Sequence, residues 1–234
     1  MQLEEIYKIY QQFPSVQTDT RKLKKNDLFF ALKGPNFNGN LFVAQAFDNG
    51  ASYVFADEEI SIADERIIYC QNSLQTLQQL AQHHRQQFQI PFIAITGSNG
   101  KTTTKELLHE ALSTTYKTYT TQGNLNNHIG IPLTILKIKP DAEMAVIEMG
   151  ANHVGEIAGY CEYAMPTHAL ITNIGKAHLE GFGSVENIKK GKGELFDYVA
   201  KHNGIAFVNA DDKAVLELGD KVKSTVSYGE SGRD

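Results

Sequence analysis

Paired cysteines, long apolar runs and an excess of positive charge are all missing from this 234-residue sequence. Its two cysteines, Cys70 and Cys161, lack the spacing of a zinc site or a disulfide framework, so we expect two free thiols. No stretch approaches the roughly 18 apolar residues that a membrane-spanning helix requires. The formal net charge of −5 argues against a broad nucleic-acid-binding surface, although it leaves room for a local basic pocket that binds a small phosphorylated molecule.

The start of the chain also lacks the basic and then apolar layout of a secretory signal peptide. Residues 1–13 have acidic side chains early and apolar side chains at helical spacing, so we expect a short amphipathic helix there. What the sequence does contain is ordinary for a globular protein: 41% of its residues are hydrophobic and 21% are charged. We expect a cytoplasmic, monomeric protein without a nucleic-acid partner and without membrane insertion.

The first third of the chain predicts a small α/β unit. Two short apolar runs, at residues 27–32 and 51–56, indicate strands, and the turn-rich residues 33–40 separate them. A helix is expected over residues 73–87, because leucines fall on one face of that segment and glutamines on the other.

A different pattern begins near residue 90, where nearly continuous apolar strands alternate with helical segments. This alternation is typical of a mainly parallel sheet that is covered on both faces. We place a domain boundary near residues 86–90, which gives an N-terminal substrate-binding domain, residues 1–87, and a nucleotide-binding domain, residues 88–234. The strands expected in the second domain are residues 91–96, 144–148, 168–173 and 205–209.

The most specific motif is a glycine-rich segment between the first of these strands and a helix that begins near Lys101. Its glycines allow a tight turn that brings backbone N–H groups against phosphate oxygens, and the helix N-terminus adds a positive dipole. Lys101 would reach the β- and γ-phosphates of ATP, and Thr102 would ligate Mg²⁺. The strict P-loop pattern has four residues between its glycines and this segment has two, so a plain glycine turn is the alternative. The segment reads Gly97-Ser98-Asn99-Gly100-Lys101-Thr102-Thr103.

Polar residues that follow other strands form a second group of candidates, because ligands gather at the carboxyl ends of the strands of an open parallel sheet. Glu148 ends an expected strand and suits a Mg²⁺ ligand, with a solvated glutamate as the alternative. His178 follows a further strand, but Mg²⁺ prefers oxygen, so an ordinary loop histidine is equally open. Lys192 lies between two glycines in a helix expected over residues 184–200. Glycine is costly inside a helix, so close approach of a bulky group is one interpretation and a solvated lysine is the other.

Four segments, in this order, resemble segments of the Mur ligases, the ATP-dependent amide-bond-forming enzymes of bacterial peptidoglycan synthesis. The resemblance covers nearly the whole chain and is strongest to the branch that adds D-alanyl-D-alanine. His128 departs from the pattern of that branch, where an acidic residue is common. The segments are TGSNGKTT at residues 96–103, GNLNNHIG at 123–130, EMGANH at 148–153 and AHLEGFGS at 177–184.

The resemblance also implies roles for residues of the nucleotide-binding domain. Glu148 and His178 would ligate Mg²⁺. Lys192 would correspond to a lysine that can be carbamylated, and a carbamate supplies oxygens that a hard cation can bind. Asn126 and Asn127 would lie near the substrate or the phosphates.

In the N-terminal domain, the segments at residues 18–21 and 33–40 look like those that hold the uridine diphosphate end of a nucleotide sugar. The residues implied are Thr20, Arg21 and Asn40. A purely structural turn is the alternative for both segments.

By this resemblance, the γ-phosphate of ATP would be transferred to the terminal carboxylate of UDP-N-acetylmuramoyl-tripeptide, with Mg²⁺ as cofactor, and the amine of D-alanyl-D-alanine would attack the resulting acyl phosphate. Members of the family continue beyond the equivalent of Asp234, so we expect a fragment that does not complete the ligation alone. One alternative is another ligase of the superfamily, such as the folylpolyglutamate or meso-diaminopimelate-adding type. The other is a non-catalytic module that binds a UDP-sugar or a nucleotide.

Overall fold

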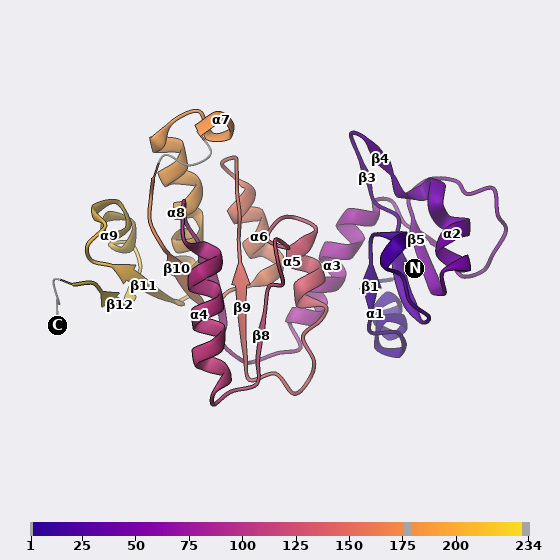
Figure 1. The fold of residues 1–234 in the computed structure, drawn as a ribbon, viewed down its shortest axis with the longest axis horizontal. Coiled ribbons are helices and arrows are strands. Elements are labelled where there is room, and N and C mark those ends of the chain that lie inside the picture. The colour runs from indigo at the N-terminus through magenta and orange to yellow at the C-terminus, as the bar shows by residue number, and fades with distance from the viewer. Residues whose placement is uncertain (1, 176–178, 231–234) are drawn as a thin grey trace. The chain divides into compact units, whose positions relative to one another are not determined.

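The structure is a computed structural model and describes residues 2–175 and 179–230. The chain divides into two compact units (Figure 1), Met1–Gln87 with Ile135–Lys137 and Phe88–Thr134 with Ile138–Asp234. Each unit is built around a parallel sheet of its own. The mainly parallel α/β fold that the sequence predicts is therefore confirmed.

The sheet of the first unit has four strands in the order β1–β2–β5–β6, and every pair is parallel. Its two central strands are the two that the sequence predicts, and all four residues of β2 are buried. The two outer strands are only two and three residues long, too short for an apolar pattern to reveal them. The strands are β1 (Val16–Gln17), β2 (Asp27–Phe30), β5 (Ala51–Ala56) and β6 (Ile67–Tyr69).

Helices of the first unit lie where the sequence gives them an apolar face. The longest, α3, begins after Asn72, whose side-chain oxygen accepts a hydrogen bond from the backbone N–H of Gln75 at 2.7 Å, and it buries Leu77 and Leu80. The expected N-terminal helix is also present. The helices are α1 (Leu3–Gln12), α2 (Val43–Asp48) and α3 (Ser73–Arg85), and the short 3-10 helices are η1 (Thr20–Lys22) and η2 (Gly39–Phe42). The turn-rich segment forms a hairpin of β3 (Lys33–Gly34) and β4 (Phe37–Asn38).

The sheet of the second unit has six parallel strands in the order β12–β11–β10–β7–β9–β8. The four inner strands are those that the sequence predicts. The two edge strands were not predicted; in β12 every residue is exposed, so no apolar run marks it. The strands are β7 (Phe92–Thr96), β8 (Thr118–Thr120), β9 (Met144–Glu148), β10 (His168–Ile171), β11 (Ile205–Asn209) and β12 (Ser224–Tyr228).

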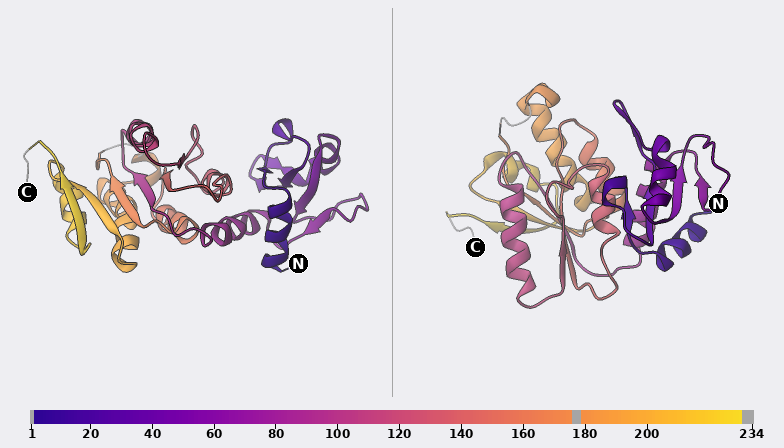
Figure 2. Two further views of the ribbon diagram at one scale, coloured as in Figure 1. Left: turned by 90° about the horizontal axis from the view of Figure 1, so that it is seen from below. Right: turned by 45° about the vertical axis from the view of Figure 1, so that its right-hand side comes forward.

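Helices cover both faces of this sheet, as a parallel sheet requires. Helix α4 lies on one face and α8 on the other, where α8 packs against α6 (Figures 1 and 2). Central strand β7 is buried along its whole length. The helices are α4 (Lys101–Ser113), α5 (Gly130–Ile135), α6 (Glu156–Ala164), α7 (Leu179–Phe182), α8 (Val185–Lys201) and α9 (Lys213–Gly219).

Two expectations from composition can be compared with the structure. Both cysteines are free, as predicted. Within residues 2–175 and 179–230, no helix is long and apolar enough to cross a membrane.

Candidate active site

The glycine-rich loop joins the end of β7 to the start of α4, the context that phosphate binding needs. Gly97 has a φ of +144° and Gly100 a φ of +79°, values that side-chain-bearing residues rarely adopt. A Cβ atom on Gly97 would lie 1.9 Å from the Oγ1 atom of Thr172, whereas a Cβ atom on Gly100 would meet nothing within 4 Å. Gly97 is therefore required both for its backbone angle and for the close approach of Thr172.

The loop is fastened to the segment that follows β10. The backbone N–H of Ser98 donates to the carbonyl of Asn173 at 3.0 Å, and the hydroxyl of Thr172 donates to the carbonyl of Asn99 at 2.6 Å. The buried Ser98 hydroxyl accepts from the backbone N–H of Gly175 at 2.9 Å. Ser98 and Asn99 are thus anchoring residues of the loop, and the loop has little freedom to move away from the sheet.

Lys101 occupies the first position of α4 and folds back over the loop. Its ammonium group donates to the carbonyls of Gly97 at 2.8 Å and Ser98 at 3.3 Å. Burial lowers the pKa of Lys101, and the negative charge of Glu148 opposes that shift. The side chain is therefore a partly buried cation at the mouth of the loop.

Glu148, the last residue of β9, is 1% exposed. Its Oε1 atom accepts a hydrogen bond from the side-chain amide of Asn126 at 2.7 Å and from the hydroxyl of Thr102 at 3.2 Å. Its Oε2 atom is buried and has no hydrogen-bond partner among the described residues. A buried carboxylate oxygen without a donor is costly, so this atom needs an explanation in function.

A cavity of about 490 Å³ lies at this point and brings together five of the residues that the sequence singles out: Lys101, Thr102, Asn126, Asn127 and Glu148. Thr103 is exposed on α4 and does not line this cavity. The remaining lining residues are His128, Gly150, Ala151, Asn152, Glu156 and Tyr160.

Sequence reasoning did not assign Tyr160 or Glu156. Burial raises the pKa of Tyr160 to about 12, so its hydroxyl keeps its proton at neutral pH. Glu156, the first residue of α6, accepts from the backbone N–H groups of Asn152 at 2.6 Å and His153 at 3.1 Å, so it holds the loop that precedes the helix. Only the recurrence of acidic and aromatic residues in the segment after Glu148 could have pointed to them, and that signal is weak.

The adjacent asparagines differ in their contacts. Asn126 donates to Glu148, and the backbone N–H of Gly150 donates to the Asn126 carbonyl at 2.8 Å. Asn127 instead accepts from the backbone N–H groups of Ile129 at 3.1 Å and Gly130 at 2.9 Å, at the start of α5. Asn126 thus belongs to the carboxylate site, while Asn127 has a structural contact as well as a place in the cavity wall.

Lys192 is fully buried in α8 and donates to the carbonyl of Ala151, a residue of the cavity wall, at 3.1 Å. Burial, and next the charge of Lys101, lowers the pKa of Lys192 to about 8, although Glu156 and Glu194 act in the opposite direction. The solvated-lysine alternative is therefore wrong. His178 lies outside the described residues.

The glycines on either side of Lys192 do mark close approach of bulky groups. A Cβ atom on Gly191 would lie 2.5 Å from the ring of Phe182, and one on Gly193 would lie 2.8 Å from a methyl group of Leu218. The interpretation of these glycines from the sequence is confirmed, and the bulky groups are hydrophobic side chains of the protein itself.

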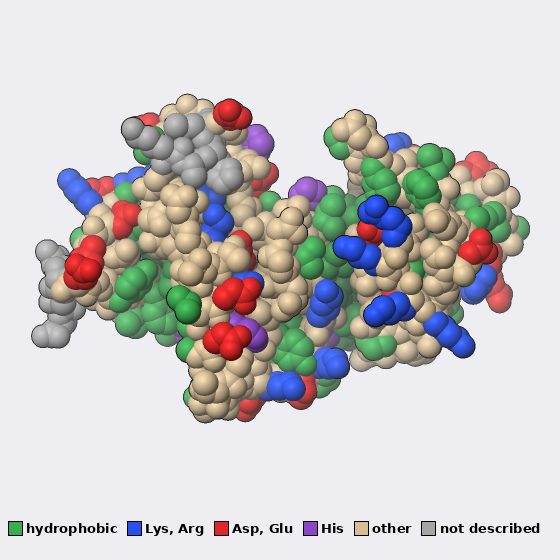
Figure 3. Space-filling view, in the orientation of Figure 1, with side chains coloured by type: hydrophobic (Ala, Val, Ile, Leu, Met, Phe, Trp, Pro, Cys, Tyr) green, Lys and Arg blue, Asp and Glu red, His purple; other side chains and the backbone are tan. Residues whose placement is uncertain are grey.

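The first unit has a cavity of about 600 Å³ beside η1. Thr20 and Arg21, two residues that the resemblance implies for the nucleotide sugar, line it, and the Arg21 guanidinium is held by Asp19 through contacts of 2.9 and 2.8 Å. Phe37 and Phe42 line it too, with ring centroids 6.2 Å apart and nearly parallel planes. Lys and Arg side chains gather on the face of this unit seen in Figure 3, which suits an anionic ligand. The other lining residues are Thr18, Asp19, Phe29 and Gln45.

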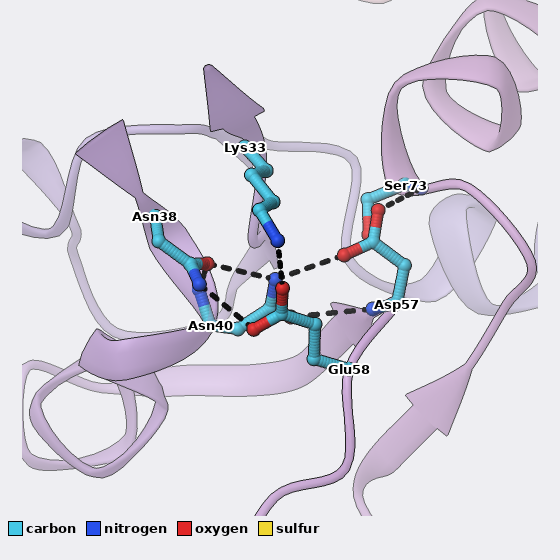
Figure 4. A network of polar contacts seen from close by, with 6 residues as sticks. All are labelled: Lys33, Asn38, Asn40, Asp57, Glu58 and Ser73. Carbon is cyan, nitrogen blue, oxygen red and sulfur yellow. Dashed lines mark hydrogen bonds and ion pairs between the residues drawn. The ribbon is translucent and has the colours of Figure 1, made fainter. Parts of the chain in front are cut away.

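Asn40 lies in a different place from Thr20 and Arg21 and is not among the residues that line this cavity. It is buried at the centre of the polar network in Figure 4. Its amide donates to Asn38 at 3.0 Å and Asp57 at 2.8 Å, and its oxygen accepts from the backbone N–H of Asp57 at 3.2 Å. Asp57 in turn caps α3 through the backbone N–H of Ser73 at 2.9 Å. These contacts make Asn40 a structural link between the hairpin side and the sheet of this unit.

The residues at Glu148 can be tested for their fit to a magnesium ion. Mg²⁺ takes oxygen ligands, uses one or two carboxylates together with substrate phosphates, and retains several waters. The donor-free Oε2 of Glu148 and the neighbouring Thr102 hydroxyl fit that requirement. No group of three His, Cys, Asp or Glu side chains converges on one point in the described part of the chain, so a closed all-protein cage is not found there.

Comparisons with known proteins agree with this geometry. The family model "Mur ligase middle domain" matches residues 95–234, and the model "Mur ligase family, catalytic domain" matches residues 12–85. The UDP-N-acetylmuramoyl-tripeptide–D-alanyl-D-alanine ligase of Bacillus subtilis is 43% identical over 199 residues, which cover 84% of this chain and 43% of that protein. The Escherichia coli ligase of the same name is 44% identical over 198 residues, which cover 85% of this chain and 43% of that protein.

A solved structure is similar as well. The MurF ligase of Thermotoga maritima in complex with ADP superposes with a TM-score of 0.84 at 34% identity, over 93% of this chain and 51% of that chain. The chain thus spans about half the length of the relatives that it matches.

Proposed function

The chain belongs to the Mur ligase family, and from this membership we propose that it binds Mg-ATP beside Glu148 and a UDP-muramoyl peptide in its first unit. These steps would serve the ATP-dependent addition of D-alanyl-D-alanine to UDP-N-acetylmuramoyl-tripeptide. The observation that carries the proposal is the buried Glu148 oxygen without a donor, next to the Thr102 hydroxyl and Lys101 at the mouth of a glycine loop. The similarity to the D-alanyl-D-alanine ligases favours this branch over the other ligases of the superfamily.

In the proposed reaction, the terminal carboxylate of the tripeptide attacks the γ-phosphorus of ATP. The bond from that phosphorus to the bridging oxygen breaks, so that ADP leaves and an acyl phosphate forms. The amine of D-alanyl-D-alanine then attacks the acyl carbon, loses a proton and expels inorganic phosphate. Phosphoryl transfer of this kind depends mainly on positioning and on neutralisation of charge.

The residues of the second unit have distinct tasks in this proposal. Lys101 leaves the loop carbonyls to neutralise phosphate charge, and the N-terminus of α4 adds its dipole. Asn126 fixes the Glu148 carboxylate through the 2.7 Å hydrogen bond. Thr102 and Glu148 would hold the magnesium ion, joined by Lys192 if it is carbamylated and by His178, which lies outside the described residues. When bound, the ion supplies positive charge against the phosphates.

In the first unit, the uracil ring would lie against Phe37 and Phe42, and the diphosphate would bind near Arg21 and Thr20. The two phenylalanines are 48% and 40% exposed, so a planar base can reach them. The proposal also places the chain in the cytoplasm as a monomer; its two free cysteines suit a reducing compartment.

Calorimetric titration of this chain with Mg-ADP and, separately, with UDP-N-acetylmuramoyl-tripeptide tests the two sites. We expect binding of both. Lys101→Met should weaken the nucleotide at least about tenfold, the equivalent of one charge-assisted hydrogen bond, and leave the sugar nucleotide unchanged. Phe42→Ala should do the reverse. Absence of heat with Mg-ADP, or a Lys101→Met chain that binds it normally, would refute the phosphate-loop assignment.

The expectation that the chain does not complete the ligation alone has its own assay. Release of inorganic phosphate that depends on D-alanyl-D-alanine would contradict it. Binding of both nucleotides without such release would agree with it, and would equally suit a non-catalytic binding module. The test of the module is the addition of a separately expressed C-terminal part of a related ligase, which restores turnover only if this chain provides catalytic residues.

A further inference from the structure

Lys105 is a buried lysine that no step of the proposed reaction uses. It and Lys192 are the two lysines with 0% exposure in the described part of the chain. Burying an ammonium group costs free energy unless its charge and its donors are satisfied. A buried lysine on the helix that follows the phosphate loop therefore requires a reason.

The contacts of Lys105 supply one. Its Nζ atom donates to the carbonyl of Thr121 at 2.7 Å and to the carboxylate of its neighbour Glu106. The hydrogen bond from Lys105 lowers the pKa of Glu106, which favours the ionised carboxylate. Glu106 reaches solvent, whereas the bond to Thr121 is fully buried. The inward-facing contact of this lysine is thus a backbone carbonyl just after β8.

Thr121 is connected in turn to Glu148. The Thr121 hydroxyl accepts a hydrogen bond from the backbone N–H of Glu148 at 3.0 Å, and the Thr121 N–H donates to the carbonyl of Val146 at 3.1 Å. Thr121 is itself fully buried. Lys105 therefore joins α4 to the residue that fixes the backbone of the catalytic carboxylate.

The same segment reaches Glu148 a second time. Five residues beyond Thr121, the Asn126 amide donates to the Glu148 carboxylate, and the Asn126 carbonyl accepts from Gly150. The loop of residues 121–126 is thus fastened to the end of β9 at both of its ends, and Lys105 fastens its beginning to α4. Helix α4 packs against both β8 and β9 and stands beside them in Figure 1.

The positions of Thr102 and Lys105 along α4 place both side chains toward the same part of the site. Thr102 lies three residues before Lys105, so their side chains share a face of the helix. Thr102 contacts Glu148 directly, and Lys105 contacts the loop of residues 121–126, whose two end residues also contact Glu148. The helix, the loop and the carboxylate form a closed set of contacts.

We propose that Lys105 is a positioning residue that holds the loop of residues 121–126 against α4, so that Glu148 and the Thr102 hydroxyl stay close enough to share one divalent cation. The inference rests on the proposed function, because the shared cation is the magnesium ion of ATP. Lys105 itself touches neither nucleotide nor substrate.

The test is the coupling between Mg²⁺ and nucleotide, measured as the ratio of the ADP dissociation constant in EDTA to that in Mg²⁺. In Lys105→Met, which keeps the apolar stem, this ratio should fall about tenfold, the usual scale for loss of a contact that orients a metal ligand. Binding of metal-free ADP should stay unchanged. A ratio equal to that of the unaltered chain would overturn the proposal.

Amide hydrogen exchange gives a readout that needs no ligand. In Lys105→Met, the amides of Glu148 and Gly150, which donate to the loop, should exchange at least about tenfold faster. The amide of Met149, which donates to the carbonyl of Ile95 in β7 at 2.8 Å, should not change. Equal acceleration of all three amides would mean general destabilisation and would refute a local positioning role.

Glu106→Gln is the matched control, since it removes the charge partner but retains the bond to Thr121. It should leave both the coupling ratio and the exchange rates nearly unchanged; effects as large as those of Lys105→Met would assign the role to the ion pair and overturn the proposal.

If Lys105→Met does not fold, Lys105→Gln, with a shorter neutral side chain, takes its place. An unaltered chain without Mg²⁺ coupling would refute the proposed function, while the exchange experiment would still decide the role of Lys105.

Discussion

Two buried charged residues, Glu148 and Lys192, are incompletely compensated by the described residues around them. Among the described residues, Glu148 has one oxygen with two donors and one oxygen with none, and the ammonium group of Lys192 donates to a backbone carbonyl. Buried groups in such surroundings reduce stability, and they are found at functional sites more often than elsewhere. The strongest sign of function in single residues is therefore a buried charged group that lowers the stability of the fold and is nevertheless present.

The pKa of Lys192 makes this cost measurable. It is lowered to about 8, below the ordinary value of 10.5, so between these two pH values the unfolded chain binds more protons than the folded chain. Stability should therefore rise with pH across that window, and the cost of the charged form should be fully present below pH 8. We predict that the free energy of unfolding of the unaltered chain, relative to Lys192→Met, increases by roughly 3 kcal/mol from pH 8 to pH 10.5.

Urea denaturation in carbonate-free buffer at several pH values measures this difference. A difference that does not change with pH would contradict the lowered pKa. In a parallel experiment with ¹³C-bicarbonate, a carbamate signal that is absent in Lys192→Met would support modification of this residue.

The glycines of the phosphate loop offer a second prediction at this scale. Both have positive φ, but only Gly97 faces a neighbouring side chain, with Thr172 1.9 Å from the position of a Cβ atom. Gly100→Ala should cost about 1–2 kcal/mol from backbone strain alone. Gly97→Ala should cost more, roughly 3 kcal/mol or above, because a steric clash is added to the strain.

Denaturant unfolding of the two alanine variants gives both numbers. Equal losses of stability would show that Thr172 can move aside freely and that the loop is less firmly fixed than its hydrogen bonds indicate.

At the scale of helices and strands, the sequence predicts the elements that bury long apolar runs. The strands at residues 144–148 and 205–209 were placed with their observed bounds, and α3 and α8 were within two residues of theirs. The edge strands were missed, since an edge strand such as β12 buries none of its residues and leaves no apolar pattern.

The candidate site residues also divide into those that the sequence could predict and those that it could not. The phosphate loop and Glu148 could be found because they sit at strand ends, where chain order and sheet geometry coincide. Phe42 and Lys105 could not, because their places depend on which segments meet in space. An exposed phenylalanine and a lysine in a polar helix look ordinary in a sequence, and burial or exposure is what distinguishes them.

Helix glycines provide a prediction for individual elements. Gly159 lies exposed inside α6, and a Cβ atom there would meet nothing within 4 Å. Gly159→Ala should therefore stabilise the chain by about 0.5–1 kcal/mol through helix propensity. Gly191→Ala, the matched change in α8, should destabilise it, since its Cβ atom would lie 2.5 Å from the Phe182 ring. Opposite signs in urea denaturation are the expected result, and a stabilising Gly191→Ala would contradict the packing around Lys192.

At the scale of the whole molecule, each cavity is lined by residues of one unit. The cavity near Arg21 draws on residues 18–45, and the cavity near Glu148 draws on residues 101–160. We predict that UDP and Mg-ADP bind independently, so that saturation with one changes the dissociation constant of the other less than about twofold. In the double variant Phe42→Ala with Lys101→Met, the two losses of binding energy should add.

Calorimetric titration of one nucleotide in the presence of the other measures this independence. A change of tenfold or more in either dissociation constant would show that binding at the two sites is energetically coupled. The assignment of each ligand to a single unit would then fail.

The neighbouring asparagines have a consequence for how this region can change in evolution or in the laboratory. Asn126 faces Glu148 while Asn127 caps α5, and the segment is held at Thr121 on one side and at Gly130 on the other, where a Cβ atom would lie 2.4 Å from the backbone of Leu125. An insertion or deletion of one residue would exchange the tasks of the two asparagines and break both. The length of residues 121–130 is thus as strongly constrained as their identity, and a chimera or a library should transfer this stretch as one uninterrupted cassette.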